Sequence, residues 1–243
     1  MAKIYEALEL AYKNKKSLPS SDSPPSLIPA RSVPSIDLEK EAAALYKNIE
    51  ALLQDKPKKI VQFIGVRKGV GVSTITRELA RFAAINVGKS VLLLDADRLA
   101  PEVHHHFDVD SRGSWIDVLA NGKDLVHTLS RVGESQLYIS PSYNSASYTP
   151  EIFDAGRVDS FWSLLRERFD LVLIDSPPFS DSPDGLAFAP QSDGVVIVVE
   201  SEKTRWKAAE HLKQSILKVG GRLLGVIVNK RRYYIPPFFF KYL

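Results

Sequence analysis

A glycine-rich stretch near residue 70 has the composition of a loop that binds phosphate. It reads Gly65-Val66-Arg67-Lys68-Gly69-Val70-Gly71-Val72-Ser73-Thr74 and lies between an apolar run and a helical segment. A glycine-rich loop that joins a strand to a helix directs backbone N–H groups at anionic oxygens. Gly69 and Gly71 permit a close backbone approach, and the Ser73 hydroxyl suits magnesium. We expect the residues from Gly69 to Thr74 to contact phosphate groups.

The same loop departs from a complete phosphate-binding loop at two positions. Val72 stands where lysine normally precedes the serine, and Val66 replaces the first glycine. An isopropyl group offers a phosphate oxygen neither charge nor a hydrogen-bond donor. Arg67 or Lys68 could supply the missing charge, although a guanidinium is not equivalent to the lysine ammonium. The alternative is a tight glycine turn that binds no ligand.

Three aspartates follow apolar runs and could hold a metal ion. Asp95 and Asp97 follow one run, and Asp175 begins Asp175-Ser176-Pro177-Pro178 after another. Carboxylates at the carboxyl ends of buried strands are placed to hold magnesium or to activate water. The alternative is that these aspartates only cap turns. We predict metal ligands at Ser73, Asp95 and Asp175, and catalytic candidates at Asp95, Asp97, Arg67 and Lys68.

These residues need a parallel sheet to bring them together. Short runs rich in valine, isoleucine and leucine predict strands at Ile60–Ile64, Val91–Leu94, Leu137–Ile139, Leu171–Ile174, Val195–Val199 and Leu224–Val228. Helical periodicity predicts helices over Ser73–Asn86, Val158–Arg168 and Thr204–Val219. The alternation is typical of an α/β fold with a doubly wound, mostly parallel sheet and helices on both faces. Ligands of such sheets bind beyond the carboxyl ends of the strands.

The chain divides into four predicted segments. Residues 1–16 have the pattern of a short amphipathic helix, which is either a docking element or a frayed terminus. Residues 17–35 are rich in proline and serine, as in an extended linker. A helical stripe from Leu38 to Leu52 opens the nucleotide-binding domain at 36–230, and an aromatic tail follows at 231–243.

Composition excludes several classes of protein. The 243 residues are 44% hydrophobic and 25% charged, as in ordinary globular domains. A net charge of +3 gives no reason to expect nucleic acid as a partner, and the absence of cysteine excludes disulfides and thiolate metal sites. No run approaches the roughly 18 apolar residues of a membrane span. Any link to a membrane is therefore expected through a partner or a surface contact.

In combination, the loop, Asp95-Ala96-Asp97 and Asp175-Ser176-Pro177-Pro178 resemble the cytoplasmic domain of bacterial tyrosine kinases. These kinases act in capsule and exopolysaccharide production and share a fold with the deviant-Walker partitioning ATPases. The resemblance extends to Pro101, His104 and Phe107, to Asp117-Val118-Leu119, to Leu224–Asn229 and to the opening Lys3–Leu8. It implies ATP or ADP with Mg²⁺ as ligand and possible self-association. It also implies the cytoplasmic part of a membrane polysaccharide co-polymerase as partner, which places the protein at the cytoplasmic face of the inner membrane.

Two further departures concern assembly and phosphorylation. The family's Glu-x-x-Arg-x-x-Arg pattern, which builds a ring of subunits, reads Glu41, Ala44 and Lys47 here. The family's terminal tyrosine cluster is reduced to three candidate phosphoacceptors among phenylalanines and prolines: Tyr233, Tyr234 and Tyr242. The aromatic and basic residues of the tail favour contact with a partner or with a membrane interface. The alternative is that the aromatic side chains pack back on the domain.

Three functions are compatible with these features. The first is a tyrosine-kinase-like regulator of exopolysaccharide synthesis with weak or absent catalysis, because Val72 removes a charge that stabilises the transferring phosphoryl group. The second is an active ATP-dependent tyrosine autokinase in which Arg67 or Lys68 replaces the lysine. The third is a partitioning-type ATPase switch. We expect Trp115, Trp162 and Trp206 to be core or half-buried residues, and the consecutive His104–His106 to bind no metal.

Overall fold

The computed structural model describes residues 26–28, 36–97, 103–107, 113–142 and 155–231. Within these ranges one sheet has eight strands: β1 (Ser26–Ile28), β2 (Lys59–Gly65), β3 (Val91–Asp95), β4 (Ser130–Val132), β5 (Leu137–Ser140), β6 (Leu171–Asp175), β7 (Gly194–Glu200) and β8 (Leu223–Asn229). Six α-helices accompany them: α2 (Ile36–Leu52), α3 (Val72–Ile85), α4 (Val103–Phe107), α5 (Trp115–Asn121), α6 (Ala155–Arg168) and α7 (Trp206–Lys218). Two 3₁₀-helices, η1 (Leu125–Thr128) and η3 (Pro183–Phe188), complete the described elements.

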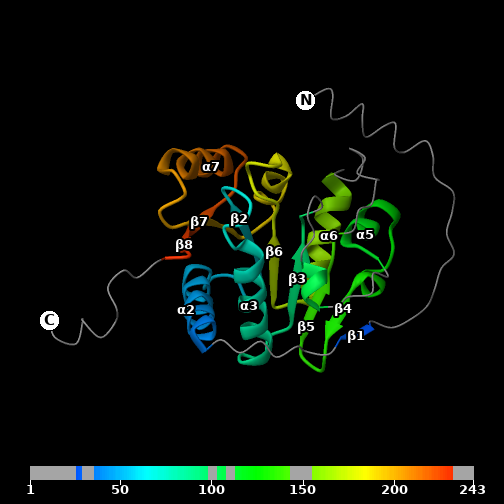
Figure 1. The fold of residues 1–243 in the computed structure, drawn as a ribbon. Coiled ribbons are helices and arrows are strands. Elements are labelled where there is room, and N and C mark those ends of the chain that lie inside the picture. The colour runs from blue at the N-terminus through cyan, green and yellow to red at the C-terminus, as the bar shows by residue number, and fades with distance from the viewer. Residues whose placement is uncertain (1–25, 29–35, 98–102, 108–112, 143–154, 232–243) are drawn as a thin grey trace.

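The sheet has the order β1-β4-β5-β3-β6-β2-β7-β8 (Figure 1). Every neighbouring pair is parallel except β4 and β5, which are antiparallel. The strand before the glycine-rich loop, β2, is therefore central, between β6 and β7. The carboxyl ends of β2, β3 and β6 meet at one edge of the sheet, which is where ligands of such folds bind.

Helices cover both faces of the sheet, as the continuous apolar strands require. On one face α2 and α3 lie side by side (Figure 1) and pack on alternate strand residues that include Phe63 and Leu93. On the other face α5 and α6 pack on Leu92 and Ile174, and α7 packs on Ile197. The predicted fold class is confirmed: each core strand buries both of its faces.

The predicted strands and long helices all form, and their ends differ from the predicted ones by at most three residues. Two short strands were not predicted from the sequence. One is β1, which lies inside the segment expected to be a linker and pairs with β4 in parallel register. The other is β4 itself, only three residues long. Both take their conformation from a neighbouring strand, which local periodicity does not encode.

The tryptophans divide into two groups. Trp115 and Trp162 are buried in the cluster beneath α5 and α6, as expected. The prediction for Trp206 is wrong, because its side chain is 75% exposed at the first position of α7. Helix α7 packs through Leu212 and Ile216, and the stripe that these residues define leaves Trp206 to one side.

Other predictions fall outside the described ranges. These include the amphipathic helix at 1–16 and the tail from residue 232 onward, so the four segment boundaries stay predictions. Val103–Phe107 forms the short helix α4, and the His106 side chain is exposed. Among the described helices, none combines the length and the apolar composition needed to cross a bilayer.

Candidate functional site

The glycine-rich loop connects β2 to α3 and adopts a conformation that requires glycine. Gly69 and Gly71 have φ angles of 78° and 101°, which L side chains rarely adopt. A Cβ at Gly71 would lie 2.3 Å from the Asn229 Nδ2 atom. Gly71 also precedes the first residue of α3 and has no side chain to cap it. The N–H groups of the first turn therefore remain available to an anion.

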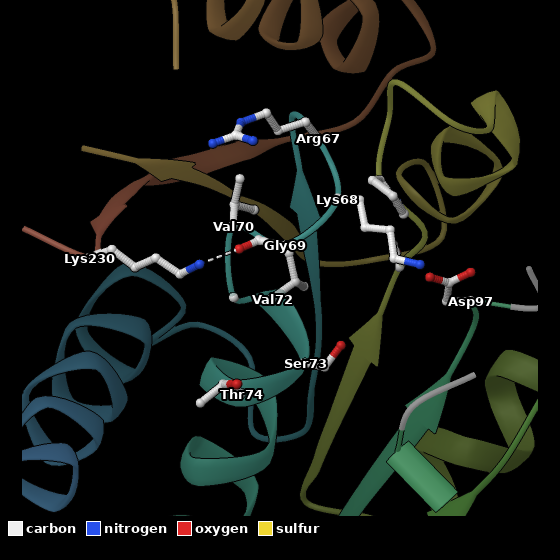
Figure 2. Close-up of a pocket in the computed structure, with 12 residues that line it drawn as sticks. Arg67, Lys68, Gly69, Val70, Val72, Ser73, Thr74, Asp97 and Lys230 are labelled. Carbon is white, nitrogen blue, oxygen red and sulfur yellow. Dashed lines mark hydrogen bonds between the residues drawn. The ribbon is translucent and has the colours of Figure 1, made fainter. Parts of the chain in front are cut away.

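The loop borders a cavity of about 230 Å³ at the carboxyl edge of the sheet (Figure 2). The cavity is lined by Arg67, Lys68, Gly69, Val70, Gly71, Val72, Ser73, Thr74, Asp97, Ser176, Pro178 and Lys230. The structure thus brings together all the predicted phosphate-contacting residues and three of the four catalytic candidates. Asp95 and Asp175 are buried and do not line the cavity. Tyr233, Tyr234 and Tyr242 lie outside the described residues.

Val72 makes the helix end of the cavity apolar. Its side chain is 9% exposed and belongs to the core cluster beneath α2 and α3. One Val72 methyl lies only 2.9 Å from where a Cβ on Gly65 would be, so the valine packs inward against the end of β2. The position that normally presents an ammonium to phosphate instead completes the hydrophobic core.

Arg67 and Lys68 point in different directions. The Arg67 Nη2 atom donates to the Glu200 Oε2 atom at 2.5 Å, and Figure 2 shows its guanidinium directed away from Ser73. Lys68 extends across the mouth of the cavity toward Asp97, on the side that Ser73 faces. Lys68 is therefore the loop cation that is better placed to meet a phosphate group.

Glu200 fixes Arg67 through a small charge cluster. The Glu200 carboxylate, at the end of β7, also accepts from the Lys203 Nζ atom at 2.6 Å. The hydrogen bond from Lys203 lowers the pKa of Glu200, and the charges of Lys203, Lys230 and Arg67 act in the same direction. An ionised Glu200 holds the Arg67 guanidinium at the opposite side of the loop from the aspartates.

Asp95 and Asp175 lie side by side beneath the cavity. They are paired residues on adjacent strands, β3 and β6, and both are buried. The Asp95 Oδ1 atom accepts from the Asp97 N–H at 3.0 Å, whereas Oδ2 makes no hydrogen bond of normal geometry with a described residue. Burial raises the pKa of Asp95 well above its ordinary value, and the neighbouring Asp175 charge raises it further. The backbone N–H groups of Asp97 and Val103 oppose that rise.

This arrangement fits a magnesium–phosphate ligand. The Asp95 Oδ2 atom, which makes no hydrogen bond of normal geometry with a described residue, and the Asp175 carboxylate beside it are suitable oxygen ligands. The Ser73 hydroxyl is nearby in the cavity wall. Within the described ranges, no group of three histidine, cysteine, aspartate or glutamate residues could hold a metal alone. Phosphate oxygens and water would therefore have to complete the coordination of Mg²⁺, which is common for this ion.

Two strands support the site in ways that sequence analysis missed. On β2, the Gln62 Nε2 atom donates to the Ser176 Oγ atom at 2.8 Å and fixes the loop after Asp175. At the end of β8, the Asn229 Nδ2 atom donates to the Val70 carbonyl at 2.8 Å and the Lys230 Nζ atom to the Gly69 carbonyl at 2.6 Å. A polar residue within an otherwise apolar strand, as at Gln62, is the signal that could have identified the first contact.

Helix α2, which carries the altered form of the family's ring-building pattern, exposes the altered positions. Glu41, Ala44 and Lys47 all face solvent on α2. Tyr46 points inward, and burial together with the charge of Glu50 raises its pKa to about 12. The outer face of α2 is therefore available, but it lacks the two arginines that make bidentate contacts in the pattern expected from sequence.

A central strand, a glycine loop that precedes a helix and two strand-terminal aspartates define an α/β fold of the P-loop class. The solved structure of the septum site-determining protein MinD with Mg-ADP from Pyrococcus horikoshii shares this fold. It has a TM-score of 0.59 and 22% identity, and the match covers 74% of this chain and 75% of that one. The chimerical protein CapA2B2 matches with a TM-score of 0.71 and 22% identity over 86% of this chain and 96% of that one.

Within that class, the chain belongs to the family described as Cellulose biosynthesis protein BcsQ, whose model matches residues 58–224. The match includes the glycine-rich loop and all three aspartates. Among characterised relatives, the chain is 28% identical over 185 residues to Tyrosine-protein kinase YwqD of Bacillus subtilis. That alignment covers 76% of this chain and 78% of the relative. The resemblance to bacterial tyrosine kinases and the P-loop fold are thereby confirmed.

Proposed function

We propose that this protein is a nucleotide-binding regulator of bacterial polysaccharide synthesis, with weak or absent tyrosine kinase activity. Its family description names cellulose biosynthesis, and a relative is a tyrosine-protein kinase. The partner in this proposal is the cytoplasmic part of a membrane polysaccharide co-polymerase, which brings the protein to the inner membrane. Nucleotide state would change how the protein engages that partner.

The observation that carries this proposal is the contrast between an intact backbone cradle and an apolar Val72. Gly69 and Gly71 keep the left-handed conformations that open the loop, and Ser73 faces the cavity. Backbone donors act on the ground-state phosphates as well as on the transition state, so nucleotide binding can persist without the lysine. A cation at residue 72 would act most strongly where charge develops during transfer. The replacement of lysine by Val72 is therefore expected to reduce catalysis much more than it reduces nucleotide binding.

Lys68 supports residual binding of the nucleotide. It reaches toward Asp97 on the side of the cavity that Ser73 faces, whereas Glu200 holds Arg67 away. The Lys68 ammonium would screen the phosphate charge without occupying the position that the missing lysine takes. We expect nucleotide binding at micromolar strength, weaker than in a complete loop.

The test is calorimetric titration of Mg-ADP and Mg-ATP into the wild type and the Val72→Lys variant. Val72→Met is the matched control, because it lengthens the side chain without adding charge. We expect the wild type to bind, Val72→Lys to bind about tenfold more tightly, a gain of about 1.4 kcal/mol, and Val72→Met to match the wild type. Absence of binding by the folded wild type would contradict the proposal, and binding regained in Val72→Lys would then trace that loss to the missing lysine.

An active autokinase is the second candidate, and the orientation of Lys68 toward Asp97 favours it. Phosphotyrosine would then appear on the purified full chain with Mg-ATP and be lost in Asp175→Asn, because Asp175 is a predicted metal ligand. The tail tyrosines Tyr233, Tyr234 and Tyr242 are the candidate acceptors, so mass spectrometry of the tail locates the modification. ATP-dependent dimerisation without phosphotyrosine would instead indicate a partitioning-type ATPase switch, the third function that is compatible with the sequence.

A further inference from the structure

The start of α7 has a charge pattern that works against helix stability. Arg205 caps the helix without a side-chain hydrogen bond, Lys207 lies in the first turn, and that turn contains no acidic residue. The N-terminus of a helix carries partial positive charge and is stabilised by acidic side chains. Two cations at this end oppose the helix dipole. A local conflict of this kind is typical of residues retained for binding.

Trp206 projects from the same turn. Trp206 is 75% exposed, the highest value for any large hydrophobic residue in the described part of the chain. An indole in water gains nothing for the fold, because α7 packs through Leu212 and Ile216 instead. An exposed tryptophan next to cations is characteristic of a surface that meets another phase or molecule.

More cations gather from the neighbouring strand. The Ser201 N–H donates to the Asn229 carbonyl, so the loop before α7 lies against the end of β8. Lys230 and Arg231 are exposed at that end. We call the surface formed by Lys203, Arg205, Trp206, Lys207, Lys230 and Arg231 the Trp206 surface.

Few acidic residues lie among the described residues around the Trp206 surface. Glu202 is exposed within the loop, and the buried Glu200 is already paired with Arg67 and Lys203. The cations that remain exposed outnumber the exposed acid, so the surface is complementary to an anionic partner. After Arg231 the sequence continues with Arg232, Lys241 and six aromatic residues. This segment therefore has the same combination of cationic and aromatic side chains as the Trp206 surface.

We infer that the Trp206 surface binds directly to the anionic headgroups of a lipid membrane. An indole flanked by long cationic side chains matches the interface of a bilayer, where the ring lies at the headgroup level and the cations meet lipid phosphates. Juxtaposed lysines and arginines are attracted by the negative surface potential of anionic lipids. This contact requires neither a bound nucleotide nor a co-polymerase, so it stands independently of the proposed function.

The test uses the full chain with vesicles of phosphatidylcholine alone or mixed with phosphatidylglycerol. Co-sedimentation measures binding, and tryptophan fluorescence gives a second readout. Trp115 and Trp162 are buried, so a blue shift on mixing reports the transfer of Trp206 to a less polar environment. We expect binding to the mixed vesicles only, weakening as salt is added, because exposed charges are screened.

Two variants locate the contact. Trp206→Ala and the double variant Arg205→Gln/Lys207→Gln should each weaken vesicle binding about tenfold, and Trp206→Ala should abolish the blue shift. Lys40→Gln/Lys47→Gln removes two exposed charges from α2 and is the matched control, expected to bind as the wild type does. All these side chains are exposed, so circular dichroism should show unchanged folding.

Three outcomes would overturn the inference. The first is the absence of binding to phosphatidylglycerol vesicles by the folded wild type. The second is equal binding by Trp206→Ala and the wild type, which would assign the contact to another part of the chain. The third is binding to poly-glutamate, but not to vesicles, with the same dependence on Arg205 and Lys207. That result would identify an acidic protein segment as the occupant of the surface.

Discussion

The carboxyl edge of the sheet divides into two halves of opposite character. On the β3–β6 side, Asp95 and Asp175 are buried, acidic and close to each other. On the β7–β8 side, the cations of Arg67, Lys203 and Lys230 surround the buried carboxylate of Glu200. The glycine-rich loop lies between them, with Lys68 directed to the acidic half and Arg67 to the basic half (Figure 2).

One loop serves both of these surfaces. Its backbone keeps the conformation of a phosphate cradle, and its side chains distribute charge between a buried ligand site and an exposed surface. Val72 adds charge to neither half, because its side chain packs in the core cluster beneath α2 and α3. The loss of one lysine therefore changes the chemistry of the acidic half while leaving the architecture of both halves in place.

The largest effect is expected where the loop meets β8. Gly71→Ala forces a side chain into a φ of 101° and places its methyl 2.3 Å from the Asn229 Nδ2 atom. We expect a loss of about 2–4 kcal/mol in the free energy of unfolding, seen as a fall of about 4–16 °C in Tm. Gly69→Ala is the control, because its φ is 78° but no atom lies within 4 Å of the added methyl. It should lose only about 1–2 kcal/mol, and equal losses would show that Asn229 is not the cause.

A smaller effect separates the two loop cations. Lys68→Ala should weaken Mg-ATP binding about tenfold, or about 1.4 kcal/mol, because it removes the charge that faces the acidic half. Arg67→Ala should change the affinity less than about threefold, since Glu200 already holds that guanidinium. Calorimetric titration of both variants measures the difference. The reverse order would mean that Arg67 leaves Glu200 when nucleotide binds, and that the two halves exchange charge.

Asp95→Asn tests the buried carboxylates through pH. The pKa of Asp95 is raised in the folded protein, so the folded state binds its proton more tightly than the unfolded chain does. The free energy of unfolding therefore falls as pH rises from the ordinary carboxyl value through the raised one. The asparagine variant lacks this loss, so it should be more stable than the wild type at pH 8, by about 1 kcal/mol, and should show no such gain near pH 4. Thermal unfolding across this range measures the difference, and a constant offset would contradict the assignment.

The smallest effect is expected at the exposed end of the basic half. Lys230→Met removes the hydrogen bond to the Gly69 carbonyl but keeps most of the apolar stem, so stability should change by less than about 0.5 kcal/mol. Asn229→Ala removes a more protected hydrogen bond to the Val70 carbonyl and should cost about 1 kcal/mol. Chemical denaturation of the two variants compares them. A larger loss for Lys230→Met would make the lysine a structural clamp on the loop.

Sequence periodicity predicted the parts of the fold that depend on local pattern. Val91–Leu94 and Leu171–Ile174 are apolar on both faces because the strands are central, and the aspartates that follow them had to meet in a parallel sheet. The direction of Arg67 could not be predicted, because it depends on Glu200, more than 130 residues later. The prediction that Trp206 is buried or half-buried was wrong for a similar reason. An aromatic residue at a helix start is buried only if a neighbouring element covers it, and periodicity does not say which elements are neighbours.

The position of β8 affects how the protein behaves in concentrated solution. It is the last strand of the described sheet, and Val226 and Val228 are 51% and 58% exposed on it. A free strand edge with apolar side chains is a template on which another chain can add. Arg222 precedes β8, and Lys230 and Arg231 follow it, so two such edges repel each other. Since salt shortens the range of this repulsion to about 8 Å at physiological strength, concentrated stocks should stay clear at low ionic strength and become turbid as salt is added.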